Sequence, residues 1–198
     1  MISNDLLKKY GAEKVHLSKK EVLFKVDTLP RYYFQVISGK IKMNNFNEDG
    51  KEFIQGIFSE GSSFGEPPLF ADLTYPAYAE AVEESTVWRL EKKKFFELLK
   101  ENSEVHLSIT KVLAGRLHYK ATMVAEISSE SPEHRLLKLI DYFKTHIHKI
   151  PDEEPYLVEL SRQQMADLTG LRVETVIRAI KSMEKKRILQ LQSHKIVR

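Results

Sequence analysis

The chain has 198 residues, enough for one ordinary domain or two small ones, and its 42% hydrophobic and 30% charged residues are typical of a folded protein. It contains no cysteine, which excludes disulfides, thiolate metal sites, cysteine-ligated iron–sulfur clusters and cysteine nucleophiles. The N-terminus lacks the apolar segment of a signal peptide, and no apolar run approaches the roughly 18 residues of a membrane-spanning helix. We therefore expect a cytoplasmic protein with no membrane partner.

The surplus positive charge is confined to the last third of the chain. Residues 1–127 hold 18 basic and 18 acidic residues, whereas residues 128–198 hold 13 basic and 10 acidic ones. Ser161–Arg198 alone hold 9 basic and 3 acidic residues. A small segment with this surplus suits a polyanion, and DNA is the obvious candidate. A lysine-rich helix that is merely solvated is the alternative explanation.

The first ninety residues have the pattern of an antiparallel β-protein. Turn residues such as Leu29-Pro30 and Ser38-Gly39 separate short stretches rich in Val, Ile, Phe and Tyr. Asp49-Gly50 between two such stretches predicts a hairpin. Many short, evenly spaced strands indicate a sandwich or barrel. The predicted strands are Glu21–Val26, Arg31–Val36, Lys40–Asn44, Lys51–Ile57 and Ser85–Leu90.

Helical periodicity begins near Lys92 and continues to Ile127 without a proline. Val105, Ile109 and Val112 lie on one apolar face. An adjoining face recurs at gaps of three and four residues and consists of Thr110, Leu113, Leu117, Lys120, Val124 and Ile127. Two such faces need two packing partners, so we expect the second face to pack on another copy of the chain in a homodimer. One broad core face inside a monomer is the alternative.

The last third contains a helix–turn–helix pattern. A domain boundary lies at Ser128–Glu133, where Ser131 offers an N-cap and Pro132 suits the first position of a following helix. Beyond it, Ser161–Leu168 predicts a short helix and Arg172–Met183 a second one, joined by a turn in which Gly170 adopts positive φ. The apolar residues that the two helices share are Ala166, Leu168, Leu171, Val176, Ile180 and Met183. In this motif the second helix enters the major groove of DNA.

The second helix carries an outward stripe of charged residues at gaps of four, three and four: Glu174, Arg178, Lys181 and Lys185. A carboxylate can accept a hydrogen bond from cytosine N4, and a guanidinium can donate two to guanine, which discriminates by roughly 1–3 kcal/mol. A solvated ion pair, worth about 0.2–0.5 kcal/mol to any helix, is the alternative. After this helix, Ile188–Leu191 and Lys195–Val197 predict a two-stranded wing whose tip, Ser193–Lys195, can touch phosphate.

This order of barrel, long helix, hinge and winged helix–turn–helix resembles the Crp/Fnr family of bacterial transcription regulators over nearly the whole chain. Asn47–Glu52 resembles the family's hairpin, and Phe64-Gly65-Glu66 resembles the start of its cyclic-nucleotide phosphate cassette. Ser161–Gln163 together with Glu174–Arg178 resembles its reading head. The resemblance implies an α+β fold with an N-terminal antiparallel β-barrel or jelly roll (1–101), a dimerisation helix with its hinge (102–130) and a winged helix–turn–helix (131–198).

The resemblance also implies a homodimer on a palindromic operator of double-stranded DNA, with half-sites about one DNA turn apart. Val173-Glu174-Thr175 followed by Arg178 is closer to the Fnr branch, which reads TTGA-type half-sites, than to the cyclic-AMP receptor. Ile177 stands where that branch has serine and can touch a thymine methyl group. The residues expected to contact DNA are Arg162, Gln163, Arg172, Glu174, Thr175, Ile177, Arg178, Lys181 and Lys195.

The ligand pocket implied by the resemblance is degenerate in this sequence. Members that bind cyclic AMP close their cassette with an Arg–Ser pair, and here Pro76 and Ala77 supply neither the charge nor the hydroxyl that a phosphate needs. The candidate pocket residues are Phe64, Gly65, Glu66, Pro76, Ala77, Leu117 and Lys120. We therefore expect no control by cyclic AMP and no cofactor. A sensor whose unidentified small molecule switches DNA binding is the alternative function.

No nucleophile–base or paired-carboxylate arrangement stands out, so we do not expect an enzyme, and the scattered histidines do not predict a metal site. An activator of transcription also contacts RNA polymerase. The resemblance implies two acidic surfaces for that contact, Glu48 with Asp49 in the hairpin and the loop Asp152–Glu154.

Overall fold

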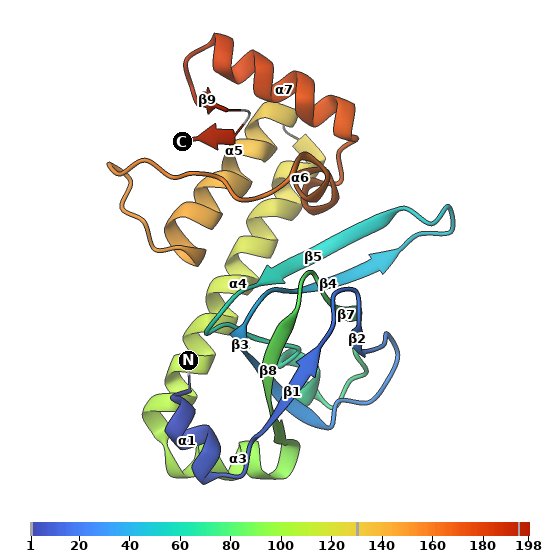
Figure 1. Ribbon diagram of the computed structural model, residues 1–198, viewed down its shortest axis with the longest axis vertical. Coiled ribbons are helices and arrows are strands. Elements are labelled where there is room, and N and C mark those ends of the chain that lie inside the picture. The colour runs from blue at the N-terminus through green and yellow to red at the C-terminus, as the bar shows by residue number, and fades with distance from the viewer. Residues whose placement is uncertain (1, 130, 194) are drawn as a thin grey trace. The chain divides into compact units, whose positions relative to one another are not determined.

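The computed structural model describes residues 2–129, 131–193 and 195–198, with the side chains of residues 123 and 125–129 outside the description. The chain divides into two compact units, Met1–Gly115 and Arg116–Arg198. Figure 1 shows strands throughout the first unit and mainly helices in the second. Among the described residues, no helix combines the length and the apolar character needed to cross a membrane.

The first unit is built from two antiparallel four-stranded sheets, which confirms the α+β expectation for this half of the chain. One sheet has the order β1-β8-β3-β6, with β1 (Glu13–Leu17), β8 (Ser85–Glu91), β3 (Tyr32–Ser38) and β6 (Ser63–Phe64). The other has the order β2-β7-β4-β5, with β2 (Val22–Phe24), β7 (Tyr78–Ala81), β4 (Ile41–Phe46) and β5 (Glu52–Phe58). The predicted turn joins β4 to β5, where Gly50 has a φ of 73°.

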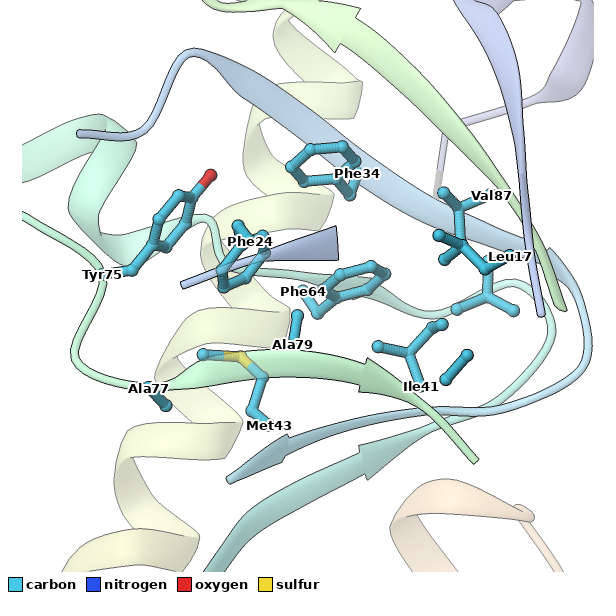
Figure 2. Packing of buried hydrophobic residues seen from close by; sticks show 12 residues of the cluster. Leu17, Phe24, Phe34, Ile41, Met43, Phe64, Tyr75, Ala77, Ala79 and Val87 are labelled. Atoms are coloured by element: carbon cyan, nitrogen blue, oxygen red, sulfur yellow. The ribbon is translucent and has the colours of Figure 1, made fainter. Parts of the chain in front are cut away.

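The main core fills the space between the inner faces of the two sheets. Figure 2 shows Phe34 and Val87 of one sheet opposite Ile41 and Met43 of the other, with Phe24 and Phe64 between them. Phe34 and Phe64 stack with ring centroids 5.7 Å apart. Inward residues alternate with outward ones along the strands, as a two-layer sandwich requires.

A second apolar cluster covers the outer face of the sheet that contains β3 and β8. Tyr33 and Trp88 point to this side, opposite to Phe34 and Val87 next to them, because successive side chains of a strand alternate. Tyr33 stacks on Phe95 with ring centroids 4.5 Å apart. The helices that contribute to this cluster are α1 (Asn4–Lys9), α2 (Pro67–Ala71), α3 (Lys92–Glu101) and the start of α4 (Ser103–Ser129).

The helical stretch after the barrel is interrupted at Asn102. The backbone N–H and the side-chain Nδ2 of Asn102 both donate to the carbonyl of Leu98, at 3.0 Å and 2.8 Å. Asn102 itself has a φ of −130° and a ψ of 79°, outside the helical region, so α3 ends there and α4 begins at Ser103. Ile109, which the sequence assigned to the face toward the barrel, is 1% exposed and belongs to the second cluster.

The second unit holds the predicted helix–turn–helix and wing. After α4 come α5 (Pro132–Tyr142), a π-helical turn η1 (Phe143–Ile147), α6 (Arg162–Thr169), α7 (Val173–Lys185) and the strands β9 (Gln190–Gln192) and β10 (Lys195–Val197). Ser131 caps α5 by accepting from the N–H of His134, and Pro132 is its first residue. Leu157 forms a bridge with Val197, so the extended segment before α6 adds to the wing.

Candidate nucleic-acid interface

Helix α6 starts with a complete capping box. The hydroxyl of Ser161 accepts a hydrogen bond from the N–H of Gln164 at 3.1 Å, and the Gln164 side-chain oxygen accepts one from the N–H of Ser161 at 2.9 Å. The pair satisfies two backbone donors that have no partner inside the helix. The capping box therefore fixes where the first helix of the motif begins.

The turn between α6 and α7 depends on Gly170, whose φ of 69° lies in the left-handed region that a glycine adopts without strain. Leu171 donates its backbone N–H to the carbonyl of Ala166 at 3.1 Å, and the Thr169 hydroxyl donates to that of Met165 at 2.6 Å. Arg172 occupies the N-cap of α7 without a capping bond from its side chain. Its guanidinium is exposed and available for an external contact.

Helix α7 has one buried face and one charged exposed face. Val176, Ala179, Ile180 and Met183 are buried against the rest of the unit. The exposed side carries the predicted stripe of Glu174, Arg178, Lys181 and Lys185. Within this exposed surface Ile177 is an apolar residue, 40% exposed, one residue before Arg178. The helix thus presents a carboxylate, cations and one aliphatic side chain on the side away from its core.

The remaining predicted contact residues are placed around this stripe. Arg162, the first residue of α6, is half-buried, and this burial lowers the pKa of its guanidinium. Gln163 is exposed, Thr175 is half-buried on α7, and Lys195 is exposed at the start of β10. The wing-tip prediction also named His194, which lies outside the described residues.

A surface pocket of about 400 Å³ lies between the N-terminus of α5 and α7. Thr175, Arg178 and Ser182 line it from α7. At its edge Lys186 pairs with Glu133 of α5 at 2.7 Å, and the hydrogen bonds from Lys186 and Ser182 lower the pKa of the Glu133 carboxyl. This ion pair ties α5 to the end of α7.

Sequence reasoning missed the contact of Glu133 with Ser182 and Lys186 because Glu133 lies 49 and 53 residues before them. The three side chains meet only in the folded unit. It also missed Asp167, whose side chain accepts from Gln163 Nε2 at 2.8 Å. A spacing of four residues within one helix was the signal that could have revealed this second contact.

The candidate ligand residues of the barrel lie in a densely packed region. Phe64 is fully buried and Glu66 is 1% exposed, with its side chain engaged in interactions within the protein. Gly65 has a φ of 73°, and a Cβ atom at this position would come within 3.1 Å of the rings of Phe24 and Tyr75. These two rings stack with their centroids 3.7 Å apart. Burial and the Glu66 carboxylate both raise the pKa of the Tyr75 phenol.

Pro76 and Ala77, which replace the phosphate-binding pair, differ in exposure. Pro76 is exposed, and its carbonyl accepts from the Asn45 side chain at 2.8 Å. Ala77 is fully buried and belongs to the core between the sheets. No group of three or more His, Asp or Glu side chains that could hold a metal ion occurs among the residues that the structure describes.

Most of the predicted dimer-helix residues are exposed along α4. Thr110, Leu117, Lys120 and Val124 are exposed, whereas Leu113 is half-buried against the second apolar cluster and the Ile127 side chain lies outside the description. The helix also exposes Leu107, Ala114 and Ala121, which the sequence analysis did not assign to this face. With the exposed predicted residues other than Lys120, they form one stripe at heptad spacing: Leu107, Thr110, Ala114, Leu117, Ala121 and Val124.

Comparison with known proteins identifies both halves of the chain. Residues 14–102 match the model of the cyclic nucleotide-binding domain, and residues 134–198 match that of the Crp-like helix-turn-helix domain. The cAMP-activated global transcriptional regulator CRP of Haemophilus influenzae is 24% identical over 192 residues, which are 96% of this chain and 83% of that protein. The chain belongs to the Crp/Fnr family. It is a DNA-binding regulator of transcription, as its relatives are, and not an enzyme.

The family's Fnr side is represented as well. The fumarate and nitrate reduction regulatory protein of Yersinia pestis is 25% identical over 181 residues, covering 90% of this chain and 72% of that protein. Two solved Crp/Fnr structures share the fold. FixK2 from Bradyrhizobium japonicum has a TM-score of 0.77 at 20% identity, covering 94% of this chain and 91% of that one. A CooA mutant from Carboxydothermus hydrogenoformans has a TM-score of 0.80 at 21% identity, covering 100% of this chain and 86% of that one.

Proposed function

We propose that this Crp/Fnr protein acts as a homodimer on a palindromic operator with TTGA-like half-sites, without control by cyclic AMP. The observation that supports this most directly is the exposed stripe on α7, presented by a capped α6 and a glycine turn. A helix with this geometry enters the major groove, where base edges are distinguishable. The two-fold symmetry of a dimer then requires a palindrome.

The side chains on α7 match the chemistry of such a half-site. Arg178 donates two hydrogen bonds to guanine O6 and N7, and Glu174 accepts one from cytosine N4. Ile177, which is 40% exposed beside Arg178, contacts a thymine methyl group. Around this centre Arg172, Arg162 and Lys195 supply cations to the phosphates that fix the register of the protein on DNA.

The exposed stripe of α4 supports the homodimer. Leu117 and Val124 are 70% and 68% exposed, and Leu107 is 55% exposed, although large aliphatic side chains are favoured in a core. Together with Thr110, Ala114 and Ala121, these residues recur every three or four positions, which is the spacing at which one helix packs along an identical partner. A second copy of α4 is therefore the occupant that fits this face.

Independence from cyclic AMP is supported by the packing of the barrel. The stacked rings of Phe24 and Tyr75 contact Gly65, and Ala77 is part of the core rather than a phosphate ligand. A phosphate brought to this region would meet the carboxylate of Glu66 without the guanidinium that an Arg at position 76 would supply. The acidic residues Glu48, Asp49 and Asp152–Glu154 are exposed and remain the proposed contacts to RNA polymerase.

Selection of binding sites from a random duplex pool, with protein free of added ligand, tests this function. Recovery of a symmetric TTGA-type palindrome is the expected result, and its affinity falls steeply with salt because phosphate contacts release counterions. Calorimetric titration with cyclic AMP should show no binding. Weak, sequence-blind binding that becomes specific when a cell extract of small molecules is added would instead favour the sensor with an unidentified effector. Selected sites without the TGA core would refute the proposed half-site.

A further inference from the structure

A buried carboxylate lies directly behind one of the exposed side chains of the DNA-binding motif. Asp167 is in the second turn of α6 and only 2% exposed. Gln163, one turn earlier on the same helix, is exposed. The Nε2 group of Gln163 donates a hydrogen bond to Asp167 Oδ1 at 2.8 Å, so a solvent-facing amide is held by a group inside the protein.

The chemistry of the carboxylate determines which way the amide is turned. An ionised carboxylate has only acceptor atoms, so it can pair with the NH₂ group of a glutamine and never with its carbonyl oxygen. With one N–H committed to Asp167, Gln163 retains its Oε1 acceptor and a single N–H donor for an external partner. An Asn in place of Asp167 would accept either orientation of the Gln163 amide.

An amide that keeps one acceptor and one donor matches a base edge better than a phosphate. A phosphate offers only acceptors, so the Oε1 of the held Gln163 has nothing to bind there. Adenine presents the complementary pair in the major groove, because its N6 amino group donates and its N7 accepts. The first helix of a helix–turn–helix ordinarily crosses the DNA backbone, and a phosphate contact by Gln163 is therefore the competing outcome.

We propose that Asp167 is a positioning residue for DNA specificity: it fixes the Gln163 amide so that this side chain reads the major-groove edge of an adenine. This inference rests on the proposed function, in which the α6–α7 motif meets the groove. A glutamine side chain that is free before binding loses conformational entropy when DNA orders it. Fixing the amide beforehand removes part of this entropic cost from the free energy of binding. A hydrogen bond that merely supports the helix, as pairs four residues apart do, would have no effect on base preference.

The test is site selection and affinity measurement with four proteins: the wild type, Gln163→Ala, Asp167→Asn and the double variant. The wild type should prefer an A·T pair at one position of each half-site by about tenfold. Gln163→Ala should abolish that preference alone, and Asp167→Asn should weaken it. In the double variant Asp167→Asn should add nothing, because its effect passes through Gln163. Glu184→Gln, which removes an exposed carboxylate of the same unit outside the proposed contact surfaces, controls for the change in charge.

Three results would overturn the inference while leaving the regulator intact. Gln163→Ala weakening all sequences equally would make Gln163 a phosphate contact. Unchanged base preference in Gln163→Ala would remove it from the interface. An equal effect of Asp167→Asn with and without Gln163 would show that Asp167 acts elsewhere. Absence of any selected sequence with the wild type would overturn the proposed function itself, and the inference with it.

A second measurement keeps the inference testable if Asp167→Asn fails to fold. The side-chain NH₂ resonances of Gln163, assigned by their loss in Gln163→Ala, report the hydrogen bond in the intact wild-type protein. The hydrogen bond to Asp167 should shift one of the two NH₂ proton signals away from its position in a solvated glutamine and should slow the exchange of that proton with solvent. Signals at the positions of a freely rotating glutamine would contradict the proposal.

Discussion

At the scale of single residues, the proposed DNA contact of α7 predicts that its exposed stripe contains side chains that read bases and side chains that bind phosphate. Arg178 lies near the centre of the stripe, beside Ile177. Arg178→Ala should cost about 1–3 kcal/mol on the preferred operator and should relax selection at one base pair. Lys181→Ala serves as the comparison, because we expect Lys181 to contact phosphate. Its loss should weaken binding to all duplexes alike and should reduce the slope of log affinity against log salt concentration by about one. Quantitative binding to the operator and to single-base variants distinguishes the two patterns.

An equal loss of affinity for every duplex after Arg178→Ala would instead show that Arg178 contacts the DNA phosphate backbone. Thr175 lines the pocket beside Arg178, so its hydroxyl would then be a second candidate contact to the same phosphate.

The residue that follows the end of α7 stores a small backbone strain. Arg187 has a φ of 59°, and its N–H donates to Glu184 while that of Ile188 donates to Met183 at 2.9 Å. Glycine is favoured in such a left-handed C-terminal position because it has no Cβ. Arg187→Gly should therefore stabilise the protein, by about 0.5–1 kcal/mol. Thermal unfolding measures the gain, and Arg187→Ala, which keeps the Cβ, should give none.

At the scale of elements, the strongly patterned segments were predictable and the weakly patterned ones were not. The capped α6, the glycine turn and α7 follow from residues with one preferred local role. Strand β7 was missed because its sequence, Tyr78-Ala79-Glu80-Ala81, has small inward residues instead of the β-branched residues typical of strands. Strand β1 was missed as well, since Glu13–Leu17 has only two large aliphatic residues.

The packing of the aromatic side chains inside the barrel could not be predicted from the sequence either. Phe24 ends β2, and Tyr75 lies between α2 and β7, 51 residues away in a segment with no strand pattern. Their rings stack beside Gly65, where the two segments come together in the fold. The spacing within one helix is visible in a sequence, whereas a contact between distant segments is fixed by the fold.

The ion pair between α5 and α7 should make the stability of the second unit depend on pH. Hydrogen bonds from Lys186 and Ser182 hold the pKa of Glu133 below its usual 4.5. A depressed carboxyl pKa stabilises the fold above the unfolded pKa, and this contribution is lost as the pH falls through the folded pKa. Glu133→Gln should therefore lower the melting temperature slightly at pH 7, and the difference from wild type should shrink in acid, below pH 4.5, as the Glu133 carboxyl of the folded protein becomes protonated.

Glu133 is partly solvated, with a side chain 25% exposed, so the difference at pH 7 should be small. Glu153→Gln, in the exposed loop before α6, is the control and should leave the melting curve unchanged at both pH values. A Glu133→Gln difference that is as large in acid as at pH 7 would assign the effect to packing.

At the scale of the whole molecule, the proposed dimer makes DNA recognition depend on the α4 stripe. A palindrome is read with high affinity only when two reading heads are joined, since the second contact is then intramolecular. Leu117 is the most exposed large apolar residue of the stripe. Leu117→Glu would place two like charges against each other in a dimer formed through α4, and we expect it to give a monomer in sedimentation equilibrium. The monomer should bind a single half-site weakly and lose its preference for the palindrome.

Gly115→Glu is the matched control, because it introduces the same charge two residues away from Leu117 where a Cβ atom would meet nothing within 4 Å. This position lies off the heptad stripe, so the variant should remain dimeric and keep the operator affinity of the wild type. A Leu117→Glu protein that stays dimeric would place the contact between copies on another surface. A monomeric variant that still binds the palindrome as tightly as wild type would separate assembly from recognition, and DNA would then itself bring two chains together.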